Sequence, residues 1–180
     1  MLRIFFYKYK KDEIEKLLSS LVVLVDKREK VNNHIIDYFE KRNIQYKIEK
    51  LKTGEYSAML PKNDEYGIVR DLYYPIAIER KNSVDELVAS ITDRNRFENE
   101  LIRAQKIHFI LLVEEQDGYE KLIRGDYISK YNPKALLGSL KAFESRYDFA
   151  TVYQSQKVSG NFIFHHLYYY IREMLMEGRI

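Results

Sequence analysis

Short apolar runs that alternate with amphipathic segments constrain the fold of this chain more than any other feature. The runs 21–26, 75–81 and 107–115 are strand-sized, and runs of this kind are typical of strands buried in a sheet. Segments with apolar residues at helical spacing separate them. Strands that alternate with helices predict an α/β fold, with a mixed central β-sheet flanked by helices on both faces.

Capping residues and turn residues place the boundaries of several elements. An S-x-x-E capping box at residue 83 predicts a helix that runs through residue 91. Asn-Pro at 132–133 predicts a second helix, which ends near residue 146. Segment 54–81 is expected to be the antiparallel part of the sheet. The other expected strands are 2–9, 46–51 and 150–154, and the other expected helices are 12–20, 31–41, 94–106 and about 159–177.

Composition excludes several classes of protein. The chain has no Cys, which removes disulfide scaffolds, cysteine nucleophiles and Cys-ligated zinc. A net charge of +3 permits a polyanionic partner but does not demand one. The longest apolar runs are too short to span a bilayer, and the first residues lack the apolar stretch of a signal peptide. We therefore expect a single domain over 1–180 that is cytoplasmic, not secreted, and uses no membrane and no nucleotide cofactor.

The segment IAIERK carries the most informative chemistry. In a strand, Glu79 and Lys81 point to one face about 6.6 Å apart, while Arg80 points to the other. A carboxylate and an ammonium group at the end of a buried strand are costly unless they are paired or bound to a cation. Antiparallel pairing with the preceding strand would bring Glu55 near Glu79. A divalent cation such as Mg²⁺ would relieve the repulsion, and Lys81 beside it could stabilise phosphate charge or position water.

Each motif by itself also has an ordinary structural explanation. An E-R-K tripeptide is common in a chain with 32% charged residues, and alone it indicates a solvated strand end. The run VDKREK could simply lead into a helix. Asp85 fits the first turn of a helix, where a carboxylate is favoured. The arginines of segment 94–106 also fit a solvated helix face, because acidic residues lie among them.

Four motifs nevertheless occur in one order: VDKREK, LKTGEY, IERKNSVDEL and SITDRNRFENE. Together they resemble the XPF-type nuclease domain, the excision-repair cross-complementation group four domain of the PD-(D/E)xK restriction-like superfamily. The resemblance covers about residues 22–115 and implies a restriction-endonuclease-like core. It also implies a DNA endonuclease that depends on Mg²⁺ or Mn²⁺. Branched or flap DNA would be the substrate, in DNA repair, recombination or the processing of mobile-element or nucleoid DNA.

The resemblance also assigns roles to single residues. Asp26, Glu55 and Glu79 would bind the metal ion, and Lys81 would complete the catalytic set. The basic helix of the family would supply Arg94 and Arg96 for DNA contact, and we add Arg103 from the same expected helix. Structural or supporting roles would fall to Arg28, Glu29, Arg80 and Asp85.

Two departures from the family leave alternatives open. Glu55 stands where the family has aspartate, and the extra methylene alters the geometry offered to Mg²⁺. A catalytically weakened DNA-binding or scaffold module is therefore an alternative. No helix-hairpin-helix module, which many relatives carry, follows the motifs in these 180 residues. RNA cleavage is a further alternative, because nothing in the sequence senses a 2′-hydroxyl group.

The final helix and one histidine yield two more expectations. Apolar residues lie on two sides of segment 159–177, which predicts packing on two sides. One explanation is a domain core on both sides. The other is a homodimer interface, which relatives of the family also form, and we expect a homodimer through this helix. His108 lies in an apolar strand and is expected to be a core histidine.

Overall fold

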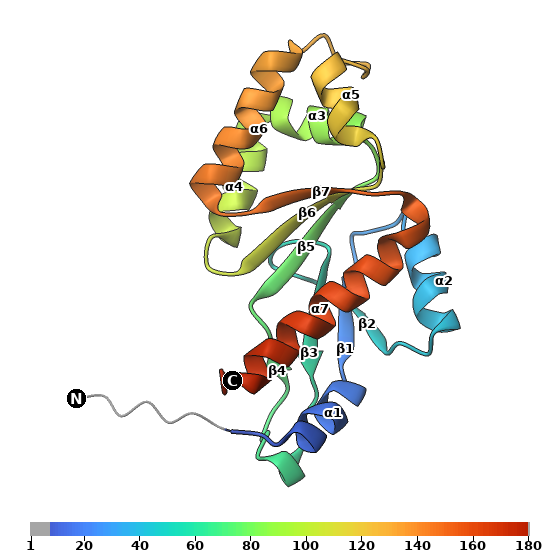
Figure 1. The fold of residues 1–180 in the computed structure, drawn as a ribbon, viewed down its shortest axis with the longest axis vertical. Coiled ribbons are helices and arrows are strands. Elements are labelled where there is room, and N and C mark those ends of the chain that lie inside the picture. The colour runs from blue at the N-terminus through green and yellow to red at the C-terminus, as the bar shows by residue number, and fades with distance from the viewer. Residues whose placement is uncertain (1–7, 180) are drawn as a thin grey trace, which may run out of the picture.

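Residues 8–179 are described by a computed structural model, in which a seven-stranded sheet runs through the molecule (Figure 1). The sheet has the order β2-β1-β3-β5-β6-β7, and the short β4 pairs with β3. The strands are β1 (Val22–Asp26), β2 (Tyr46–Glu49), β3 (Tyr56–Leu60), β4 (Leu72–Tyr73), β5 (Ile76–Lys81), β6 (His108–Val113) and β7 (Ala150–Tyr153).

The sheet is mixed, as the sequence predicted. β1 runs parallel to β2, and β5, β6 and β7 run parallel to one another. β3 is antiparallel to both β1 and β5, so it joins the two parallel groups. Tyr56 pairs with Ile78, which places the next positions, Glu55 and Glu79, opposite each other at the end of the two strands.

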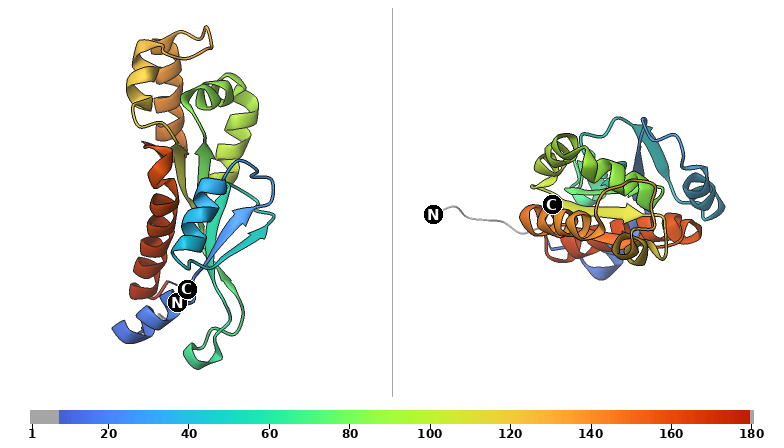
Figure 2. Two further views of the ribbon diagram at one scale, coloured as in Figure 1. Left: turned by 90° about the vertical axis from the view of Figure 1, so that its right-hand side faces the viewer. Right: turned by 90° about the horizontal axis from the view of Figure 1, so that it is seen from above.

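Helices cover both faces of the sheet, which confirms the predicted architecture, and Figure 2 shows α7 and α4 on opposite sides. Alternate residues of β5 divide the core: Ile76 and Ile78 face the core of α1, α2 and α7, while Ala77 faces the core of α3, α4, α5 and α6. The helices are α1 (Lys11–Ser19), α2 (Asn33–Lys41), α3 (Val84–Thr92), α4 (Arg94–Ala104), α5 (Gly118–Arg124), α6 (Pro133–Tyr147) and α7 (Ser159–Met176), with 3₁₀ turns η1 (Asp64–Tyr66) and η2 (Gln156–Val158).

The capping residues chosen from the sequence begin their helices. The Asn132 side chain accepts a hydrogen bond from the backbone N–H of Ala135 at 3.1 Å. The Ser83 hydroxyl accepts one from the N–H of Glu86 at 3.2 Å. The Glu86 carboxylate reaches the N–H of Asn82 rather than that of Ser83, one residue further back than a capping box requires. The end of β5 is therefore tied to the first turn of α3.

Some expectations differ from the structure. Most of the strand expected at 2–9 lies outside the described residues. Helix α5 and strand β4 were not predicted, because elements of seven and two residues are too short to show a period. The expectation of a core His108 is wrong: it is the exposed first residue of β6, and its Nε2 lies 3.1 Å from Nε2 of His166 on α7. Within residues 8–179, no helix has the length and apolar character that crossing a membrane requires.

Candidate active site

The candidate site lies where the ends of β1, β3 and β5 meet, and Gly54 permits that meeting. Gly54 has φ +71°, and a Cβ atom added there would lie 2.8 Å from Ala77 Cβ and 3.2 Å from the Ile78 carbonyl oxygen. The next residue is held on both sides. The N–H of Glu55 donates to Ile78 O at 2.9 Å, and its carbonyl oxygen accepts from the N–H of Asp26 at 2.8 Å. The backbone at Glu55 is thus fixed between two strands.

Glu79 and Lys81 share one face of β5, as the period of a strand predicts. Lys81 Nζ lies 2.6 Å from Glu79 Oε1, and the two side chains are only 9% and 8% exposed. Burial raises the pKa of Glu79 to about 7 despite the favourable charge of Lys81. Burial lowers the pKa of Lys81, but the neighbouring carboxylates outweigh it and leave that pKa raised. The lysine is therefore a cation at neutral pH.

Glu55 adds a second carboxyl group to this buried pair. Burial, and next the charge of Glu79, raise the pKa of Glu55 to about 10. One lysine is thus set against more acidic groups than it can neutralise. Carboxylate oxygens are the ligands that hard divalent cations take, and such a cation would remove the repulsion. The donor chemistry of Glu55 and Glu79 therefore fits Mg²⁺ or Mn²⁺.

Asp26, the first metal ligand expected from the sequence, is occupied by hydrogen bonds. Its Oδ1 accepts from the backbone N–H and the Nε of Arg28 at 2.8 and 2.7 Å. Its Oδ2 accepts from Arg28 Nη2 at 2.9 Å and from the N–H of Leu51 at 2.7 Å. Burial raises the pKa of Asp26, but these bonds outweigh it and leave the pKa lowered. In this conformation no three His, Asp or Glu side chains of residues 8–179 are arranged to hold a metal ion.

Arg80 lies on the opposite face of β5 from Glu79, in a buried network of charges. Its Nη1 pairs with Glu114 at 2.7 Å, and its Nη2 pairs with Glu29 at 3.1 Å. The arginine is 3% exposed and the Glu114 side chain is 0% exposed. The other Glu114 oxygen lies 2.7 Å from Nε2 of His34. Sequence reasoning missed Glu114, although its place just after the most apolar strand, parallel to β5, could have indicated it.

Asp85 is not brought into the site. Its Oδ1 accepts a hydrogen bond at 2.7 Å from the N–H of Ile128, in the loop between α5 and α6. Neighbouring helical residues point about 100° apart, so Asp85 turns to this loop while Glu86 faces the site. In this structure Asp85 anchors a loop.

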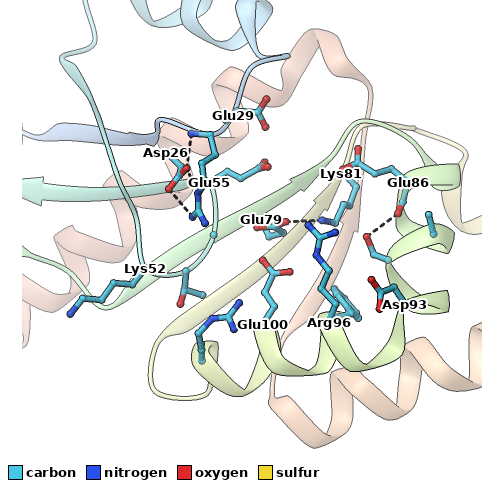
Figure 3. Close-up of a pocket in the computed structure, with 17 residues that line it drawn as sticks. Asp26, Glu29, Lys52, Glu55, Glu79, Lys81, Glu86, Asp93, Arg96 and Glu100 are labelled. Atoms are coloured by element: carbon cyan, nitrogen blue, oxygen red, sulfur yellow. Dashed lines mark hydrogen bonds and ion pairs between the residues drawn. The ribbon is translucent and has the colours of Figure 1, made fainter.

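Helix α4 forms the far wall of the site, a hollow of about 600 Å³ (Figure 3). Arg96, Glu100 and Arg103 line it, because residues at this spacing share one face of a helix. Arg94 lies elsewhere: its guanidinium carbon is 4.6 Å from the ring centre of Phe143. Sequence reasoning selected the arginines and missed Glu100 between them, although the same helical spacing places all three on this wall.

Comparison with known proteins identifies the family. A model of the ERCC4 domain matches residues 25–165. Two solved structures with similar folds are "XPF from Aeropyrum pernix" and "XPF from Aeropyrum pernix, complex with DNA". Their TM-scores are 0.60 and 0.59, each at 18% identity over 85% and 84% of this chain. This chain covers 66% and 65% of theirs, just under two thirds. A search of curated protein sequences finds no match.

The matched segment includes all four motifs and every residue of the hollow. The resemblance that the motifs indicated is therefore confirmed. The chain belongs to the ERCC4 domain family, a family of nucleases.

Proposed function

We propose that this protein is a metal-dependent DNA endonuclease that hydrolyses phosphodiester bonds, with Mg²⁺ or Mn²⁺ as its cofactor. The observation that carries the proposal is the convergence of Glu55, Glu79 and Lys81 in one hollow walled by arginines. Opposed carboxylates with a buried cationic lysine suit the hydrolysis of a phosphate ester. The XPF relative solved with DNA supports nucleic acid as the partner.

The residues of the hollow have different proposed roles in metal binding, charge stabilisation and phosphate binding. Glu55 and Glu79 are the ligands that we propose for the metal, and Asp26 can join them only if it releases Arg28. A bound divalent cation would neutralise phosphate charge and acidify a bound water molecule. Lys81 holds a positive charge where the leaving or attacking oxygen would lie. Arg96 and Arg103 would bind phosphates on either side of the reacting group.

The substrate and the cellular process are proposals that go beyond membership of the family. We propose branched or flap DNA as the substrate, and DNA repair or recombination inside the cell as the setting. Residues 1–180 would act as a single nuclease domain. The arginines in the hollow contact backbone phosphates in this proposal, so they carry no sequence preference of their own.

A homodimer through α7 is a further part of the proposal. The buried side of this helix faces the sheet through Ile163, Leu167 and Ile171. Its outer side carries aromatic rings, and Tyr169 is 55% exposed there. Tyrosine is enriched in protein interfaces because its ring is large and its hydroxyl tolerates water. A second copy of the chain is the partner that we propose for this side.

Two observations favour a second candidate function, a weakened nuclease that serves as a DNA-binding or scaffold module. Asp26 is bound to Arg28, and Glu55 is longer than the aspartate that the motif expects. A site in this state binds metal only after its side chains rearrange. The two candidates differ in whether divalent metal produces cleavage.

A cleavage assay separates the candidates. Labelled single-stranded, duplex, flap and forked DNA, with a matched flap of RNA, would be incubated with Mg²⁺, Mn²⁺ or EDTA. The variants are Glu79→Ala and Lys81→Ala, and Lys141→Ala on the surface of α6 is the control. We expect the wild-type protein to cleave flap or forked DNA only when metal is present. Glu79→Ala and Lys81→Ala should lose this activity, and Lys141→Ala should keep it.

Three outcomes would contradict this expectation. Full activity of folded Lys81→Ala would refute the site. DNA binding without cleavage in any metal would favour the scaffold function, and preferential cleavage of the RNA flap would change the substrate class.

A further inference from the structure

The number of carboxylates that face the hollow raises the question of which one joins Glu55 and Glu79 at the metal. Asp26 borders the hollow, but both of its oxygens are held by Arg28 and Leu51. Moving it to a metal ion would leave a buried backbone N–H without its acceptor, and such a loss is unfavourable. A carboxylate that is free to move and already faces Glu79 would serve better.

Glu100 meets both conditions. It projects from α4 toward Glu79 across the hollow, as Figure 3 shows. Its carboxyl group acts electrostatically on Glu79, Lys81 and Arg28. The side chain is half-buried and stands on a helix, so its Cα is fixed while three torsions let the carboxylate move.

Glu79 and Glu100 present two carboxyl groups to each other across the hollow, as ligands of one cation do (Figure 3). Without a cation, two such groups repel or must share a proton. A cation between Glu79 and Glu100 would remove this repulsion and leave Arg96 and Arg103 on the same wall for phosphate.

We propose that Glu100 is a ligand of the divalent cation and that it joins Glu55 and Glu79 in place of Asp26. This inference rests on the proposed function. It couples the metal to α4, because Arg96 and Arg103 stand on the same face of that helix. Metal binding would then pull α4 toward β5 and set the two arginines for phosphate contact. Asp26 would instead hold Arg28 and the segment at Leu51 in place.

The test measures metal binding without DNA or cleavage. Metal-free protein would be titrated with Mn²⁺, and the free ion would be followed by electron paramagnetic resonance. We expect Glu100→Gln to raise the Kd for Mn²⁺ at least tenfold, since even residues that only support metal ligands change affinity by about 10-fold to 100-fold. Glu98→Gln is the matched control, because it removes the same charge from the same helix while its side chain pairs with Arg146.

A second variant distinguishes direct binding of the metal by Glu100 from a long-range effect of its charge. Glu100→Asp keeps the charge but shortens the reach from a fixed helix, so it too should weaken Mn²⁺ binding at least several-fold. A long-range electrostatic role would leave its affinity near that of the wild type. Metal-free Glu100→Gln should melt at the same temperature as the wild type or higher, because Glu79 loses an acidic neighbour, while its stabilisation by Mn²⁺ should shrink.

The outcomes distinguish this inference from the proposed function. Wild-type protein that binds no Mn²⁺ would refute the metal-dependent function, and the inference with it. Wild-type protein that binds Mn²⁺, with Glu100→Gln binding within twofold of it, would refute only the role of Glu100. Lower thermal stability of the metal-free variant, with unchanged metal affinity, would assign Glu100 a structural role instead.

Discussion

Replacement of Gly54 by alanine tests whether the site depends on the close approach of β3 to β5. A residue with Cβ in the left-handed region, where Gly54 has φ +71°, loses about 1–2 kcal/mol. The new Cβ would also lie 2.8 Å from Ala77 Cβ and 3.2 Å from the carbonyl oxygen of Ile78, neither of which can rotate away. Overpacking of this kind costs about 1–3 kcal/mol. We therefore expect Gly54→Ala to lower the free energy of unfolding by about 2–5 kcal/mol.

Urea unfolding at neutral pH would measure this loss, with Gly138→Ala as the control. A Cβ at Gly138 meets no heavy atom within 4 Å, and the residue lies inside α6. Alanine there should raise the free energy of unfolding by about 0.5–1 kcal/mol through helix propensity. A loss below about 1 kcal/mol for Gly54→Ala would show that the strands separate easily. Gly54 would then not be the residue that fixes Glu55 beside Glu79.

Three further predictions concern charge and assembly. The folded protein holds a proton on Glu79, whose pKa is about 7 against an ordinary 4.5, so metal-free protein should lose thermal stability as pH rises from about 4.5 to 7. A melting temperature that rises over this window would contradict the burial of Glu79. Glu114→Ala should cost about 3 kcal/mol because it takes one of two carboxylate partners from buried Arg80 and leaves only Glu29, whereas Glu120→Ala, in an exposed pair, should change urea unfolding little. Tyr169→Glu should shift a concentration-dependent dimer to monomer in sedimentation, and an unchanged association would exclude this face of α7.

The buried pair of Glu79 and Lys81, with Glu55 opposite, was predictable because it depends on one strand and one strand pairing. The two-residue period of a strand places Glu79 beside Lys81 and turns Arg80 away, and the structure agrees. The antiparallel pairing of β3 and β5 places Glu55 opposite Glu79, and this can be predicted without knowing where any helix lies. These relations are local or depend on the register of one pair of strands. The order of residues was therefore sufficient to predict them.

Other features depend on how elements rotate and pack, which the sequence pattern does not specify. Nothing in the motif VDKRE shows that Arg28 folds back on Asp26 with both of its oxygens occupied. The turn of Asp85 toward Ile128 joins residues 43 positions apart. Glu100 reaches Glu79 only because α4 docks at a particular rotation. His108 was expected in the core because its strand is apolar, but β6 begins at that residue, at the edge of the core, where its exposed ring stacks on His166 and Tyr170 of α7.

The position of α7 also has a consequence for the synthesis of the protein. Ile163, Leu167, Ile171 and Leu175 complete the core that surrounds β1, β3 and α2, and each is fully buried. A ribosome makes β1 and α2 long before it makes these four residues. The nascent amino-terminal half therefore emerges with an apolar face that has no partner until translation has passed residue 175. We therefore expect chaperones to contact that half during synthesis and the yield of folded protein to depend on the rate of translation.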